Sequence, residues 1–145
     1  MSDASQTLLV VDPAPKSRLA LVAALRERWT VVVPDTDEAP VRCARKMRPA
    51  VVLLVIHRGE LSTVQRTARI LKTEAGTPPR VGLLDPRHRV RDAAAMLEAC
   101  GADGYLGGRA SEEQIRAFTH AVVQGRKQQL GVAERTRLLD RLRRR

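Results

Sequence analysis

Short apolar runs alternate with amphipathic stretches along the chain, and most of the apolar runs end at turn-forming residues. The runs with the pattern of buried strands are Thr7–Val11, Val31–Val33, Ala50–Ile56, Val81–Leu84 and Gly104–Leu106. Each is followed by residues with apolar positions at helical spacing, in the segments 15–29, about 37–47, 61–76, 90–100 and 111–123. Five rounds of strand and helix predict a parallel sheet with right-handed crossovers and helices on both faces.

Several residues mark where the predicted helices begin and end. Pro15 stands at a first helical position, where its missing N–H costs nothing. Gly101 stands where a helix C-cap prefers glycine. Ser111 and Gln114 have the S-x-x-Q spacing of a capping box, which predicts the start of the last helix.

The 145 residues amount to one domain, and their composition limits how its core is built. Only Trp29, Tyr105 and Phe118 are aromatic. The core must therefore consist of aliphatic side chains, which suits a parallel sheet covered by helices. The scarcity of aromatic residues also argues against a surface that stacks nucleic-acid bases.

Other features bear on location and on metal chemistry. The longest apolar run, Ala50–Ile56, is much too short to span a bilayer, and the N-terminus lacks a signal-peptide pattern, so we expect a cytoplasmic protein without membrane association. Cys43 and Cys100 stand apart from each other and from histidines, which favours packing roles over a disulfide or zinc site. His57, His88 and His120 lack the spacing of metal ligands, so no metal is expected.

Basic residues are concentrated at the C-terminus. The formal charge is +10, and residues 126–145 hold eight basic side chains against two acidic ones. We therefore divide the chain into a domain at 6–124 and a basic helix or linker at 125–145. The arginines that dominate this tail are Arg135, Arg137, Arg141, Arg143, Arg144 and Arg145. Three interpretations stay open: a linker or coiled coil leading to an output domain, an arm for nucleic acid, and a solvated end.

Three stretches carry a resemblance to a known family. They are T-L-L-V-V-D at Thr7–Asp12, P-A-V-V-L-L at Pro49–Leu54 and G-A-D-G-Y-L at Gly101–Leu106. Because of these three motifs, the segment 6–124 resembles the receiver domains of bacterial response regulators. The resemblance implies a doubly wound, flavodoxin-like sheet with strand order 2-1-3-4-5 and a role in two-component signalling.

The residues that the resemblance aligns with the phosphorylation site depart from the receiver pattern. The aligned positions hold Asp12, Pro13, Val55, Asp85, Gly108 and Arg109. Val55 replaces the phosphoacceptor aspartate, and a branched hydrocarbon can neither attack a phosphoryl donor nor bind Mg²⁺. Pro13 replaces an acidic residue, Asp85 a Ser or Thr, and Gly108-Arg109 a Lys-Pro pair. We therefore expect a degenerate pseudo-receiver that is no enzyme and needs no cofactor.

The carboxyl ends of the strands should still form a crevice, where open α/β sheets usually bind ligands. Its expected rim is His57, Arg58, Arg87 and His88. We expect Arg58 or Arg109 to pair with Asp12 or Asp85 in place of a metal. The alternative is a basic pocket for an anionic metabolite or nucleotide.

A second expected site is the face by which receivers dimerise or meet partners. Its candidate residues are Tyr105, Leu106, Ala95, Ala99, Ile115 and Phe118. Tyr105 takes the place of the receiver's aromatic switch residue and is expected to be a fixed contact. The leading hypothesis is a phosphorylation-independent module that binds a protein partner, with homodimerisation through this face as one form. The alternatives are a nucleic-acid-binding regulator that uses the tail and an active receiver that uses Asp12 or Asp85 as acceptor.

Overall fold

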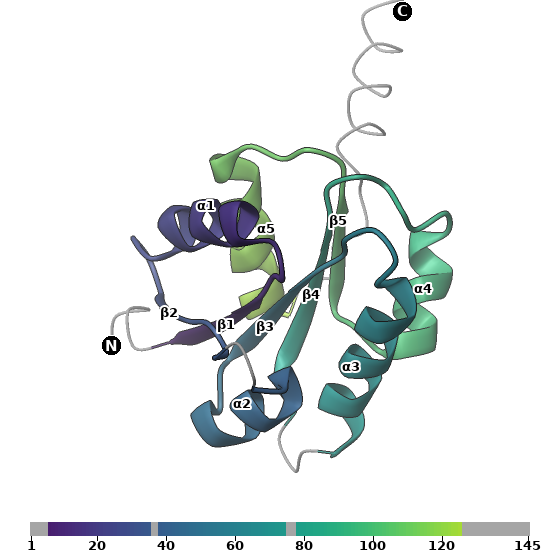
Figure 1. The fold of residues 1–145 in the computed structure, drawn as a ribbon, viewed down its shortest axis with the longest axis horizontal. Helices are drawn as coiled ribbons and strands as arrows, with labels where there is room; N and C mark the ends of the chain where they lie inside the picture. Colours follow the sequence, from purple (N-terminus) through teal and green to yellow (C-terminus); the bar gives the residue numbers. More distant parts are fainter. Residues whose placement is uncertain (1–5, 36–37, 75–77, 126–145) are drawn as a thin grey trace, which may run out of the picture.

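The computed structural model describes residues 6–35, 38–74 and 78–125 (Figure 1). Its strands are β1 (Thr7–Val11), β2 (Thr30–Val32), β3 (Val51–Val55), β4 (Arg80–Asp85) and β5 (Gly104–Gly107). Its helices are α1 (Pro15–Leu25), α2 (Pro40–Met47), α3 (Leu61–Glu74), α4 (Ala93–Cys100) and α5 (Glu112–Val123). The predicted alternation of five strands and five helices is confirmed.

The strands form one parallel sheet in the order β2-β1-β3-β4-β5, as the resemblance implied. In Figure 1, α1 and α5 cover one face of the sheet, whereas α2, α3 and α4 cover the other. All five residues of β3 are buried, because this strand lies at the centre of the sheet. A strand covered on both faces has no solvent side, which explains its uninterrupted apolar sequence.

Successive strand residues supply two separate cores, one on each face of the sheet. The core under α2, α3 and α4 includes Leu9, Val52, Leu54, Val81, Leu83 and Tyr105. The core under α1 and α5 includes Leu8, Val10, Leu53, Val55, Trp29 and Phe118. Burying each large aliphatic side chain contributes about 1.5–3 kcal/mol, and most of the largest fully buried side chains belong to β1, β3 and β4.

The predicted caps agree with the structure. Gly101 ends α4 with a left-handed φ of 75°, which glycine adopts without strain. Ser111 accepts a hydrogen bond from the Gln114 amide, and the Gln114 side chain accepts one from the Ser111 amide. Both halves of the capping box are therefore present at the start of α5.

Helix α4 starts three residues later than the pattern suggested. The Asp92 side chain caps it by accepting a hydrogen bond from the Ala95 amide at 3.0 Å. The amides of Arg89 and Val90, just before and at the predicted start of this helix, donate to the Asp85 side chain instead. A carboxylate four and five residues earlier in the chain thus keeps this segment out of the helix.

The basic tail at 126–145 lies outside the described residues, so the division of the chain near residue 124 stays a prediction. Within 6–35, 38–74 and 78–125, none of the helices has the length and apolar character needed to cross a membrane.

Candidate functional site

The carboxyl edge of the sheet brings together residues from three strands. Asp12 directly follows β1, Val55 ends β3, and Asp85 ends β4. The strand register fixes this arrangement, since Val11 pairs with Leu54 and Val55 pairs with Leu84. Asp12, Val55 and Asp85 thus share the edge of the sheet where parallel sheets usually bind ligands.

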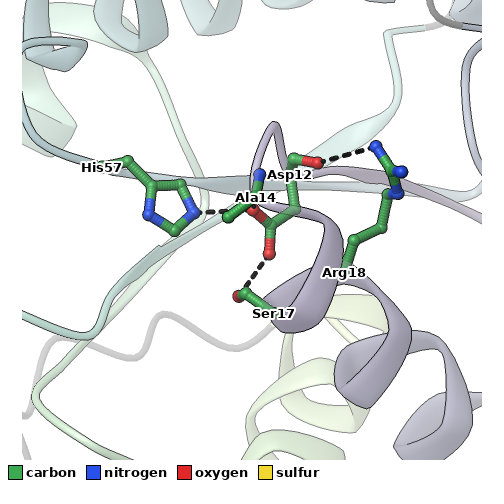
Figure 2. Close-up of polar contacts among 5 residues, drawn as sticks. All are labelled: Asp12, Ala14, Ser17, Arg18 and His57. Atoms are coloured by element: carbon green, nitrogen blue, oxygen red, sulfur yellow. Dashed lines mark hydrogen bonds and ion pairs between the residues drawn. The ribbon is translucent and has the colours of Figure 1, made fainter.

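Asp12 is buried and is satisfied by donors from two segments (Figure 2). Its Oδ1 accepts a hydrogen bond from the Ala14 amide at 2.9 Å and lies 2.6 Å from Nε2 of His57. Its Oδ2 accepts a hydrogen bond from Oγ of Ser17 at 2.5 Å. We call these contacts the Asp12 network. Ser17 was not among the predicted site residues, although its position in the first turn of α1, five residues after Asp12, was a usable signal.

The expected arginine pairing of these carboxylates is wrong. The Asp12 carboxylate contacts His57, whose side chain is 23% exposed, whereas Arg58 and Arg109 are both exposed. The physical reason is reach: His57 follows β3 by two residues and lies directly beside the end of β1. Arg18 is nearby, but its guanidinium contacts the Asp12 backbone carbonyl at 3.4 Å rather than the carboxylate.

Asp85 is completely buried, and both of its carboxylate oxygens have partners. Oδ1 accepts a hydrogen bond from the Arg89 amide at 2.9 Å, and Oδ2 accepts one from the Val90 amide at 2.8 Å. Oδ2 also accepts a hydrogen bond from the Tyr105 hydroxyl at 2.6 Å. We call these contacts the Asp85 network. Three donors compensate a charge that would otherwise be costly to bury.

Tyr105 is buried in the core under α2, α3 and α4, and its hydroxyl is bound to Asp85. The expectation of a fixed contact agrees with this geometry. Gly107 allows it, because a Cβ there would come within 2.7 Å of the Tyr105 hydroxyl and 2.8 Å of Cε1 of His88. Any larger residue at 107 would therefore displace the tyrosine ring or the β4–α4 loop.

Val55 is 3% exposed and packs in the core under α1 and α5 together with Leu84. Beside it lies a cavity of about 310 Å³ between α1 and the β5–α5 loop. The cavity walls are mainly apolar, and Gly108 and Arg109 contribute to its lining. The position that the resemblance assigns to the phosphoacceptor is thus a hydrocarbon wall of an apolar cavity.

The remaining rim residues do not converge on the two carboxylates. Arg58, Arg87 and His88 are exposed on the loops that follow β3 and β4, and Pro13 is exposed before α1. Over the described ranges, no group of three or more His, Cys, Asp or Glu side chains is placed to hold a metal ion. Mg²⁺ prefers octahedral oxygen ligation, and the two carboxylates here are already bound by protein donors. The residues present therefore do not fit the ion.

The expected interaction face is only partly a surface. Ala95 and Ala99 are exposed on α4, but Tyr105 and Phe118 are buried, in the cores on opposite faces of the sheet. Leu106 and Ile115 are half-buried and line the apolar cavity. Assigning Tyr105 and Phe118 to this face was wrong, because helices cover both sides of β5.

Comparisons with known proteins agree with this architecture. No protein-family model matches the chain. The chain is 31% identical over 110 residues to the "Probable transcriptional regulatory protein TcrX" of Mycobacterium tuberculosis, in an alignment that covers 75% of this chain and 46% of TcrX. It therefore spans about half the length of this curated relative.

Two solved structures show the same fold. The response regulator ChrA, from a heme-sensing two-component system, matches with a TM-score of 0.64 and 24% identity, over 95% of this chain and 66% of ChrA. The signal receiver domain of NarL from Mycobacterium tuberculosis matches with a TM-score of 0.63 and 24% identity, over 84% of this chain and 98% of that domain. This chain has the receiver fold. In the terms of that fold, Asp12 directly follows the first strand, Val55 ends the third and Asp85 ends the fourth.

Proposed function

We propose that the chain is a non-catalytic receiver-fold module of bacterial signalling that binds a protein partner without being phosphorylated. One observation carries the proposal: the third strand ends in a buried valine, where the resemblance places the phosphoacceptor. A valine side chain has no nucleophilic atom, so the position cannot accept a phosphoryl group.

The two carboxylates support the same conclusion. A metal ion or phosphoryl donor that approached Asp12 would compete with His57, Ser17 and the Ala14 amide. At Asp85 it would compete with the Tyr105 hydroxyl and two backbone amides in a buried site. Breaking such contacts leaves buried donors unsatisfied, which costs about 1–3 kcal/mol for each group. Both carboxylates serve the fold rather than phosphoryl chemistry.

The partner-binding part of the proposal rests on the receiver fold and on the exposed part of the expected face. Ala95 and Ala99 present small side chains on the outer side of α4, where a partner helix or a second copy can approach closely. The large apolar side chains that are most exposed in the described ranges are elsewhere, with Leu19 71% exposed on α1 and Met47 41% exposed on α2.

Incubation of the full chain with a small phosphodonor in Mg²⁺ buffer, followed by intact-mass spectrometry, tests the proposal. We expect no mass increase of a phosphoryl group, while a phosphorylatable receiver in the same buffer is labelled. Stoichiometric labelling would overturn the proposal. The variants Asp12→Asn and Asp85→Asn would then identify the acceptor, because the labelled carboxylate is lost in one of them.

A second candidate is a nucleic-acid-binding regulator, favoured by the name of the similar protein TcrX and by the basic residues at 126–145. Fluorescence anisotropy with labelled duplex DNA and RNA, across a salt series, separates the two candidates. Binding that requires residues 126–145 and weakens steeply with salt would favour this candidate. Equal and weak binding by the full chain and by a version ending at Gln124 would exclude it.

A further inference from the structure

The cavity beside Val55 exists because small side chains face one another across it. Helix α1 contributes Ala20 and Ala24, and the β5–α5 loop contributes Gly108 and Ala110. Leu21 and Arg109 of these two segments also line the cavity, but they leave the space between the segments open. The volume of about 310 Å³ lies at the lower end of the range of small-molecule sites. At about 30 Å³ for each non-hydrogen atom, the space accommodates roughly ten atoms.

The walls of the cavity are mainly apolar, with Ser17, Asp85 and Glu112 as further lining residues. Val55 and Leu84 form the floor at the ends of β3 and β4, and Leu106 and Ile115 close the side toward α5. Apolar walls attract the hydrocarbon part of a ligand in proportion to the surface that it removes from water. A ligand for this site therefore needs a compact apolar body.

Arg109 supplies the charge at this cavity. It is exposed, lines the cavity, and has no hydrogen bond or ion pair with the rest of the described chain. The acidic groups nearby have partners of their own. Glu112 lies 3.6 Å from the Arg116 guanidinium, and the Asp85 carboxylate is bound to Tyr105, which belongs to the core on the opposite face of the sheet. A guanidinium without a partner at an apolar cavity favours an anionic head group.

We propose that this cavity binds a small monocarboxylate with an apolar body of about eight carbon atoms, whose carboxylate contacts Arg109 at the cavity mouth. Arg109 is one of the two arginines, with Arg58, that were expected to pair with Asp12 or Asp85. In the structure both aspartates are satisfied without it, which leaves its charge available to a ligand. The proposed ligand site is separate from the proposed function. Ligand binding can therefore be measured in the absence of a protein partner and of a phosphodonor.

Titration of the full ¹⁵N-labelled chain with sodium octanoate, followed by amide chemical shifts, tests the site. Octanoate has a seven-carbon tail and one carboxylate, so it matches the space and the charge. We expect saturable shifts at Val55, Leu84 and Leu106. Acetate supplies the charge without the body and should give none of them. Absence of saturable shifts with octanoate, or shifts confined to residues 126–145, would overturn the proposal.

Two variants separate the apolar and charged contributions. Ala20→Leu adds side-chain volume at an exposed helix position beside the cavity, and should weaken octanoate and neutral 1-octanol alike. Arg109→Gln should weaken octanoate about tenfold, in keeping with the loss of one charged hydrogen bond, and leave octanol unchanged. Arg87→Gln removes the same charge from an exposed loop position outside the cavity lining and serves as the control. Equal loss of octanoate binding in Arg87→Gln and Arg109→Gln would contradict the assigned site.

Discussion

Asp12 and Asp85 are both buried carboxylates at the carboxyl edge of one sheet, yet different kinds of donor satisfy them. The donors to Asp85 are two amides of its own following loop and a tyrosine hydroxyl from the neighbouring strand. The donors to Asp12 include a partly exposed imidazole, which contacts solvent as well as the carboxylate. The comparison indicates that Asp85 organises the fold of the β4–α4 loop, whereas Asp12 mainly holds two segments side by side.

Among changes to the two networks, removal of the Asp85 carboxylate should reduce the free energy of unfolding the most. Asp85→Ala leaves the Tyr105 hydroxyl and two amides without their acceptor in a buried site, and we expect a loss of about 3 kcal/mol in the free energy of unfolding. Urea denaturation measures it as a lower midpoint at an unchanged slope. Asp85→Asn preserves the shape and should cost less, while a loss below about 1 kcal/mol in Asp85→Ala would contradict the assigned role.

Removing one donor from the same network should have a smaller effect. Tyr105→Phe keeps the ring in the core and deletes the hydroxyl that donates to Asp85. We expect a loss of about 1.5 kcal/mol, because the carboxylate keeps its two amide donors. The same urea experiment measures this loss. The double variant with Asp85→Ala should lose less stability than the two single losses combined, because both changes break the same hydrogen bond between Tyr105 and Asp85.

Breaking the Asp12 network should cost less again. His57→Ala removes the imidazole, but Asp12 keeps its bonds to Ser17 and to the Ala14 amide, and solvent can replace a partly exposed partner. We expect a loss of about 1 kcal/mol or less in the free energy of unfolding. His120→Ala, at an exposed position on α5, should stay within about 0.5 kcal/mol of the parent and serves as the control. A loss in His57→Ala as large as in Asp85→Ala would abolish the distinction between the two networks.

The alkylation rates of the Cys43 and Cys100 thiols can show whether removal of the Asp85 carboxylate opens the structure locally. Burial raises the pKa of the Cys43 thiol to about 11, with Glu38 as the next cause, and burial also raises the pKa of Cys100. A raised pKa lowers the thiolate fraction at a given pH, so alkylation of the native chain at pH 8 should be slow at both sites. Helix α4 follows the loop that Asp85 holds, and Cys100 is the last residue of this helix, whereas Cys43 lies in α2. Asp85→Ala should therefore accelerate alkylation of Cys100 more than of Cys43, as site-resolved mass spectrometry would measure. Equal acceleration at both sites would indicate global rather than local opening.

Local patterns in the sequence were sufficient for the elements of the fold. Apolar runs gave the strands, and Ser111 with Gln114 and Gly101 gave two helix ends, because these signals act between residues close in sequence. The motifs that resemble receivers supplied the strand order.

The partners at the candidate site were less predictable. His57 reaches Asp12 across 45 positions of the chain, and Tyr105 reaches Asp85 across 20. Periodicity contains no information on such choices, which depend on strand register and on the side from which a ring approaches. The burial of Phe118 was equally unpredictable. Its position on α5 is compatible with an exposed face, but in the structure it packs in the core under α1 and α5.

The most direct test of the central claim is the amide spectrum of the chain in Mg²⁺ buffer, before and after addition of beryllofluoride, which mimics a phosphoryl group on a carboxylate. We predict unchanged resonances at Asp12, Val55, Asp85 and Tyr105, because no acceptor carboxylate stands at the end of β3 and both flanking carboxylates are bound by protein donors. Saturable shifts at these residues that require both Mg²⁺ and beryllofluoride would contradict the claim and show a working phosphoryl site.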